Sequence, residues 1–211
     1  MSRWKIVAFS ALTLAFMTLL MLYPPGKYRP RRGDGAEYRS WTLPRREAFF
    51  VQLAAFETEE QAQAFAEQTE DYVRVLPGAA YRCLARWYPA REQAEAAAAE
   101  ARGRFPQASV YEAVRPRTEQ SALCARRDAE ADLARDQALW DAACAAQRAA
   151  ELLERAPEHR EEARRLCLSA LAMAQLSGAD LPDPFETAGA SNPLYEARRA
   201  SLDWVTRVVS P

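Results

Sequence analysis

A phrase that occurs twice in this chain constrains its fold more than any other feature of the sequence. Glu-Gln-Ala-x-Ala spans residues 60–64 and again residues 92–96, each time beginning four residues after an aromatic side chain, Phe56 or Tyr88. The first copy follows Thr58-x-x-Gln61, a capping-box pattern that satisfies free amides at a helix start. The second follows Pro89, which is well tolerated in the first turn of a helix. The repetition predicts a strand–helix unit that is built twice.

Four runs of apolar and aromatic residues flank the two expected helices, at residues 48–56, 71–76, 81–88 and 108–114. Pro77-Gly78 supplies a turn between the second and the third run. The resulting order is β-α-β-β-α-β, the split βαβ arrangement. We therefore predict an α+β fold class, with a four-stranded antiparallel sheet and two helices on one face of it.

Alternation along the strands predicts the side chains on the uncovered face of this sheet. The candidate ligand-binding residues are Phe50, Gln52, Arg82, Leu84, Arg86 and Tyr111. Amide and guanidinium groups beside flat aromatic rings suit a polar, ring-shaped ligand such as a sugar. Two alternatives stay open, namely a face that is merely solvated and a face that the C-terminal helices cover.

Nucleic acid is not an expected partner. The chain has 28 basic and 29 acidic residues, so no bulk positive charge would attract it. Open sheets of this topology can bind single-stranded RNA, but the Lys/Arg-Gly-aromatic run of such proteins is missing.

The quoted residues resemble the SPOR, or sporulation-related repeat, domain over residues 47–115. The resemblance rests on "FFVQLAAF", on the alanine-bearing helix with "EEQAQAFA", and on "YRCLARWYPAREQAEAAAAEARGRFPQASVYEAV". It implies the ferredoxin-like βαββαβ fold and binding to peptidoglycan, specifically to glycan strands that have lost their stem peptides. It also implies a role in cell division, sporulation or wall remodelling, with Gln52, Arg82 and Tyr111 on the glycan-binding face. The chain departs from the family at Ala54-Ala55, where the family has Gly-Ser, and at Arg86, where it has glycine.

The segment at residues 1–26 is predicted to be a transmembrane anchor. Residues 6–26 form an uncharged, mostly apolar run that is long enough for a helix across a bilayer. Trp4 and Tyr23 stand near the two ends of this run. A cleaved signal peptide is the competing interpretation. Residues 27–46 follow as a basic, Pro- and Gly-containing linker that we expect to be flexible.

Two orientations are compatible with these flanks. Basic residues on both sides of the apolar run, with more after it than before it, favour a cytoplasmic C-terminal part. The resemblance favours the opposite orientation, a single-pass cell-membrane protein with its C-terminal part outside the cytoplasm, because a peptidoglycan binder must reach the wall.

Residues 116–211 are predicted to be α-helical and to form a small bundle. One or two helices are expected over residues 118–156, another after Pro157 ending at Gly178, and a last one capped by Asn192. The bundle would dock an envelope or divisome protein, or it would pack on itself or on the sheet domain.

No catalytic constellation is evident. The chain has a single histidine, His159, and four widely spaced cysteines, so we expect no metal, no cofactor and no enzymatic activity. A disulfide from Cys124 or Cys144 to Cys167 stays open. The alternative function is a non-catalytic scaffold whose SPOR-like fold and bundle bind a protein partner.

Overall fold

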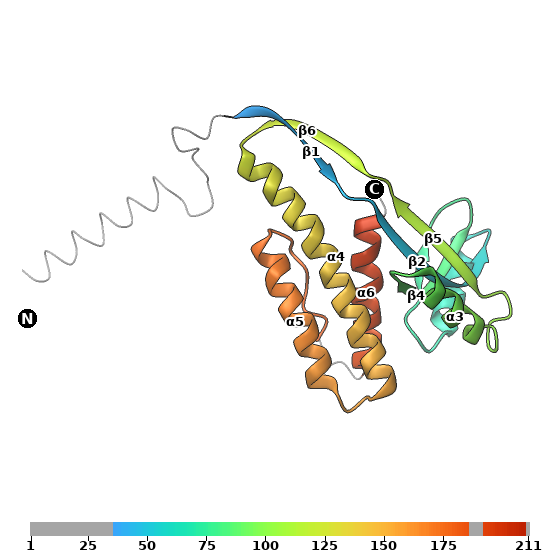
Figure 1. The fold of residues 1–211 in the computed structure, drawn as a ribbon. Helices are drawn as coiled ribbons and strands as arrows, with labels where there is room; N and C mark the ends of the chain where they lie inside the picture. The colour runs from blue at the N-terminus through green and yellow to red at the C-terminus, as the bar shows by residue number, and fades with distance from the viewer. Residues whose placement is uncertain (1–35, 186–191, 210–211) are drawn as a thin grey trace, which may run out of the picture.

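A computed structural model of the chain describes residues 36–185 and 192–209. This part of the chain contains five helices and two antiparallel sheets (Figure 1). The strands are β1 (Glu37–Leu43), β2 (Arg46–Phe56), β3 (Arg74–Leu76), β4 (Tyr81–Tyr88), β5 (Ser109–Arg115) and β6 (Thr118–Cys124). The helices are α2 (Glu59–Gln68), α3 (Arg91–Ala101), α4 (Arg126–Arg155), α5 (Arg160–Leu176) and α6 (Pro193–Val209).

The duplicated unit folds into the predicted four-stranded antiparallel sheet. Its strand order is β3-β4-β2-β5, and its elements follow the chain as β2-α2-β3-β4-α3-β5. The hydroxyl of Thr58 accepts a hydrogen bond from the amide of Gln61, which confirms the helix start. Ala62 of α2 and Ala98 of α3 are completely buried in one cluster with side chains from one sheet face. Both helices therefore cover that face, and alanine at the contact lets them approach it closely.

The opposite face of the sheet is not open. Phe50, Leu84 and Trp87 project from it into a second cluster, which they share with α4, α5 and α6. Trp204 of α6 lies in the same cluster and is 1% exposed. The expectation of a free face is therefore wrong, and the C-terminal helices that were predicted pack on the sheet domain.

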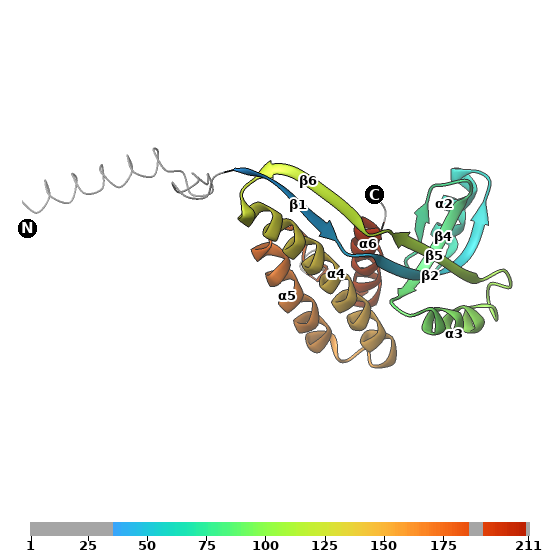
Figure 2. The same ribbon diagram turned by 45° about the horizontal axis from the view of Figure 1, so that its top comes forward.

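A two-stranded ribbon of β1 and β6 continues the β2–β5 strand pair beyond the end of the sheet. Leu43 pairs with Thr118 in the ribbon, and Arg46 pairs with Arg115 in the sheet, so one register runs through both. The residues between these pairs include Pro44 and Pro116, which have no amide to donate to a ladder. The prolines separate one long pair of antiparallel segments into a sheet part and a ribbon part, and the ribbon runs over α4 (Figure 2).

Two predicted segment boundaries are wrong, because the ribbon lies where a linker and a helix were expected. Residues 37–43 form a strand, although they were assigned to a flexible linker over residues 27–46. Residues 118–124 also form a strand, so the helical region begins at Arg126 and not at residue 116. Each segment is extended because it pairs with the other.

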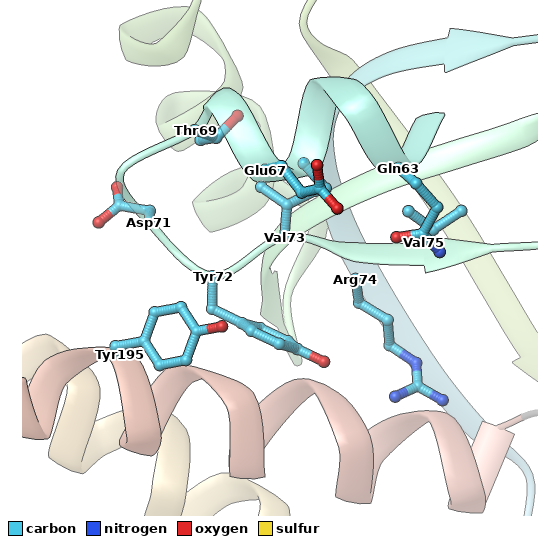
Figure 3. A pocket seen from close by; sticks show the side chains of 10 residues that line it. Gln63, Glu67, Thr69, Asp71, Tyr72, Val73, Arg74, Val75 and Tyr195 are labelled. Atoms are coloured by element: carbon cyan, nitrogen blue, oxygen red, sulfur yellow. The ribbon is translucent and has the colours of Figure 1, made fainter. Parts of the chain in front are cut away.

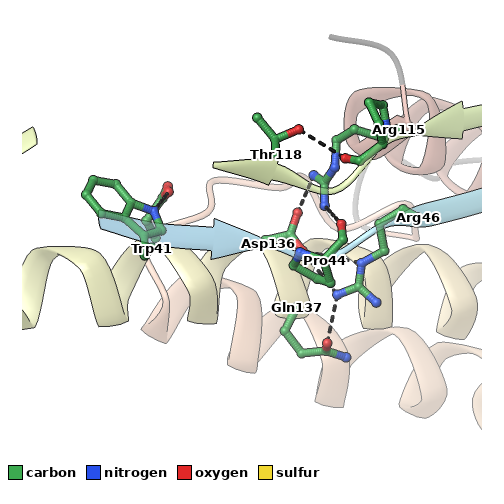
Figure 4. Close-up of polar contacts among 9 residues, drawn as sticks. Trp41, Pro44, Arg46, Arg115, Thr118, Asp136 and Gln137 are labelled. Carbon is green, nitrogen blue, oxygen red and sulfur yellow. Dashed lines mark hydrogen bonds and ion pairs between the residues drawn. The ribbon is translucent and has the colours of Figure 1, made fainter. Parts of the chain in front are cut away.

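A buried ion cluster fixes the joint between ribbon and sheet to α4. The carboxylate of Asp136, 7% exposed, pairs with Arg115 and accepts a hydrogen bond of 3.1 Å from Arg46 (Figure 4). Arg115 also donates to the carbonyl oxygen of Pro44, 2.9 Å away, which ties the cluster to the proline joint itself. Further along the ribbon, the indole of Trp41 donates to Asp132 of α4 at 2.7 Å.

The three C-terminal helices form a layer with α4 in the centre. α5 packs along one side of α4 and α6 along the other (Figure 1). Two predicted helix-end signals are present: the side chain of Asn192 accepts from the amide of Tyr195, and Gly178, which has a φ of 77°, follows the end of α5 at Leu176. All four cysteines are free thiols.

The predicted anchor at residues 1–26 and most of the predicted linker lie outside the described residues. Among the helices that the structure does describe, none has the length and apolar character needed to cross a membrane.

Candidate functional site

Two of the six predicted ligand-binding residues are enclosed. Phe50 and Leu84 have no exposed surface, because α6 lies on the sheet face from which they project and α4 contributes side chains to the same buried cluster. They hold the two halves of the molecule together by apolar burial. In this arrangement neither can contact a sugar.

Gln52, Arg82 and Tyr111 lie on the same face and remain half-buried. The guanidinium carbon of Arg82 lies 4.8 Å from the centre of the Tyr111 ring, a cation–π contact. The Tyr111 ring lies 6.2 Å from that of Phe50. The structure thus groups these three predicted residues, but Arg82 covers one surface of the ring on which a sugar would stack.

Arg86 lies on the other face of the sheet. The register of β2 with β4 is irregular between Val51 and Ala54, so Arg86 pairs with Val51, and Trp87 pairs with Phe50. Val51 belongs to the core under α2 and α3, whereas Trp87 enters the core shared with α6. The prediction that Arg86 shares the face of Gln52 is therefore wrong, because strict alternation cannot anticipate a bulge.

Glu154 of α4 is the main partner of Arg86. Burial of Arg86 disfavours its charge, but the Glu154 carboxylate and Tyr88 together outweigh this, so the pKa of the guanidinium lies above its ordinary value. The Glu154 carboxylate also forms an ion pair with Arg198, with a distance of 3.0 Å between Oε1 and Nη2. The side chain of Arg198 is only 5% exposed. Arg86 therefore stabilises the contact between the sheet and the helices and is not available to bind a ligand.

Polar contacts between the sheet and α6 involve residues that the sequence did not identify as candidates. The indole of Trp87 donates to the hydroxyl of Ser201 at 2.7 Å, and that hydroxyl donates to Gln147 of α4 at 3.1 Å. Asp203 of α6 pairs with Arg74 and accepts from the hydroxyl of Tyr72. None of these pairings has a sequence signal, because each joins residues more than fifty positions apart.

A groove of about 540 Å³ lies where α2, β3 and α6 meet (Figure 3). Tyr72 and Tyr195 stand edge to face at one side of it, with ring centres 5.4 Å apart. Burial, with the nearby Asp203 carboxylate as the second cause, raises the pKa of Tyr72 to about 12, so this hydroxyl is a proton donor at neutral pH. The polar side chains of Gln63 and Glu67 line the groove from α2.

The described residues contain no group of three His, Cys, Asp or Glu side chains that could hold a metal ion. His159 is exposed and hydrogen-bonded to Glu162 at 3.0 Å, so it belongs to the surface at the start of α5. Burial raises the pKa of the Cys167 thiol to about 12 and that of the Cys83 thiol to about 11, which keeps both protonated at neutral pH.

Comparisons of the chain with protein-family models, with curated proteins and with solved structures gave no match.

Proposed function

We propose that this chain is a non-catalytic interaction module of the bacterial cell envelope, in which a SPOR-like sheet and three helices act as one rigid body toward a protein partner. The observation that supports it is the shared core, in which Phe50, Leu84 and Trp87 meet Trp204. The sheet face that would receive a glycan strand is used inside the molecule. The residues that remain for recognition are on the outside of the helices and the ribbon.

Energetics favour this proposal over glycan binding at the centre of the face. A glycan could reach that surface only if α6 moved away and exposed Phe50 and Leu84, which are completely buried. Exposing these two side chains costs about 3–6 kcal/mol, which lowers the apparent affinity of any glycan by about a hundredfold or more. Exposing Trp87 as well would increase that cost.

Membrane attachment through residues 1–26, with the folded part outside the cytoplasm, is part of the proposal. It rests on the uncharged run at residues 6–26 and on the resemblance to a wall-binding family. Fusing alkaline phosphatase to the C-terminus tests the orientation, since the enzyme is active only outside the cytoplasm. An inactive enzyme in a stable fusion would place the folded part in the cytoplasm.

Glycan binding is the second candidate, because Gln52, Arg82 and Tyr111 are grouped and half-buried. In this case the Arg82 guanidinium would leave the Tyr111 ring and bind a sugar hydroxyl, and the freed ring would stack on the sugar. Glycan strands without stem peptides are the expected ligand, by the resemblance.

Retention of the purified full-length chain on peptidoglycan sacculi separates the two candidates. We expect no increase in retention when an amidase has removed the stem peptides. An increase that disappears in the triple variant Gln52→Ala, Arg82→Ala, Tyr111→Ala would overturn the proposal and establish the second candidate. The matched control is Gln120→Ala, Arg117→Ala, Tyr38→Ala, which removes the same three residue types from exposed positions in the ribbon and next to it.

A further inference from the structure

The outer surface of α5 is apolar over its second half. Ala163, Cys167, Leu171 and Ala174 are buried and face α4, as their spacing of four, four and three residues requires. On the outer side Leu168 is 40% exposed, Met173 is 59% exposed and Leu176 is 82% exposed. Ala172, also exposed, lies between Leu168 and Leu176 at helical spacing. We call these four residues, 168, 172, 173 and 176, the α5 patch.

Unpaired charges stand at both ends of the α5 patch. Arg164 and Arg165 lie one turn before it, are exposed, and make no ion pair with any other described residue. Asp180 is exposed just beyond the helix end and likewise has no ion-pair partner within residues 36–185 and 192–209. The last turn of α5 contains no basic residue of its own, and the cation nearest to Gly178 at the helix end is the Arg135 guanidinium of α4.

The end of α5 has a defined geometry that places Asp180. The amide of Ala179 donates to the carbonyl oxygen of Ala174 at 2.8 Å. The amide of Gly178 donates to the carbonyl oxygen of Gln175 at 2.9 Å. These two bonds with a positive φ at Gly178 form a Schellman motif, which stops the helix sharply. Asp180 therefore adds its negative charge directly at the helix C-terminus.

We propose that the α5 patch binds a second copy of this chain, through two α5 helices that pack antiparallel and cross at Ala172. In this arrangement Leu168 of each copy lies opposite Leu176 of the other, because both are four residues from the crossing point. The small side chain of Ala172 at the centre lets the two backbones approach closely. The patch is thus complementary to itself, as a twofold-symmetric interface requires.

Charge selects the antiparallel direction. Antiparallel packing places Arg164 and Arg165 of one copy beside Asp180 of the other, and it does so twice. Parallel packing would set the four arginines against each other and leave both aspartates unpaired. The inference depends on α5 alone and holds whether or not the sheet binds a sugar.

Cysteine cross-linking of the full-length chain in its membrane tests both contact and direction. In a Cys124→Ser, Cys144→Ser background, Ala172→Cys should give a dimer with a short bismaleimide. Two differently tagged copies, one Leu168→Cys and one Leu176→Cys, should also cross-link. Leu168→Cys should not cross-link with itself, because eight residues of helix rise separate the two positions by about 12 Å along the axis.

The absence of an Ala172→Cys dimer would overturn the proposal, and so would a Leu168→Cys homodimer, which indicates a parallel pair. A cross-link to a chain of another size would show that a different protein occupies the patch, which also overturns it. Leu176→Glu should raise the dimer dissociation constant by at least about tenfold, since a buried leucine contact is lost at two symmetric places. Leu123→Glu is the matched control, because this ribbon leucine is 70% exposed and lies outside the patch.

Discussion

Ser201 connects three segments of the chain through one hydroxyl. It has no exposed surface, accepts from the indole of Trp87 in β4 and donates to the amide oxygen of Gln147 in α4. Trp87 and Ser201 are both fully enclosed, so neither polar atom can turn to water. A buried donor that loses its partner keeps the cost of its lost hydration. The Ser201 hydroxyl therefore contributes more to the stability of the fold than an exposed hydroxyl of the same geometry would.

We expect Ser201→Ala to lower the free energy of unfolding by about 1–3 kcal/mol, because it leaves the Trp87 indole unpaired in the core. Chemical denaturation of the purified chain, followed by tryptophan fluorescence, measures this change. Ser121→Ala is the control: its hydroxyl also pairs with an aromatic side chain, Tyr38 at 2.9 Å, but on the exposed ribbon. We expect the control to change stability by less than about 0.5 kcal/mol. Equal effects of the two substitutions would show that the contact between β4 and α6 is not buried.

At the level of the element, the ribbon depends on its joint to α4. A two-stranded ribbon is marginally stable on its own in water. β6 has mostly exposed side chains, and only Leu43 of β1 is buried. Asp136 compensates by joining Arg46, at the start of β2, to Arg115, at the end of β5. The two arginines are only 12% and 14% exposed, so each needs this carboxylate.

We expect Asp136→Asn to destabilise the chain by about 3 kcal/mol, because it leaves two guanidinium groups largely buried with no countercharge between them. Thermal unfolding with a matched variant on the same helix gives the comparison. Glu130→Gln removes an exposed pair with Arg126, with a Nε–Oε1 distance of 2.7 Å, and should cost less than about 1 kcal/mol. If Asp136→Asn were as mild as this control, the ion cluster would be dispensable for holding the ribbon.

The sequence predicts the elements whose apolar side chains are buried in a core. It does not predict strands that form only by pairing with a distant segment of the chain. The two alanine-bearing helices have clear periodicity because each has one core-facing side, and residues 48–56 form an almost continuous apolar run because both faces of β2 are buried. Residues 37–43 and 118–124 have little periodicity because both faces of the ribbon are largely exposed. Their strands form by pairing across more than seventy residues, with Leu43 opposite Thr118. No local pattern encodes such a contact.

For the candidate site, the sequence grouped Gln52, Arg82 and Tyr111 correctly on one face. It misplaced Arg86, because the irregular register of β2 with β4 is a tertiary feature with no local signal. It also predicted a last helix capped by Asn192, and it left open whether the helical bundle packs on itself or on the sheet domain. The structure gives the answer at the scale of the whole molecule: α6 packs into the sheet face that the βαββαβ unit leaves uncovered.

One core for sheet and helices has a consequence for how the whole molecule unfolds. Phe50, Leu84 and Trp87 of the sheet lie in one cluster with Leu153 of α4 and Trp204 of α6. Neither half can unfold without exposing the apolar surface of the other. The Trp87 indole, with its ring centre 5.3 Å from that of Trp140 in α4, reports on this contact directly.

We therefore expect a single cooperative transition in chemical denaturant, with the same midpoint by tryptophan fluorescence and by far-ultraviolet circular dichroism. Fluorescence follows the contact between sheet and helices, whereas circular dichroism is dominated by the helical layer. Leu84→Ala should lower both midpoints together and cost about 2–5 kcal/mol, because a fully buried leucine is lost from the shared core. Met173→Ala is the control, because Met173 is 59% exposed on the outside of α5 and should leave both midpoints nearly unchanged when the chain is monomeric. Two separate transitions, with fluorescence changing before the helices unfold, would mean that α6 detaches from an intact sheet. In that case Gln52, Arg82 and Tyr111 would become fully accessible, and glycan binding would regain the surface that the shared core now occupies.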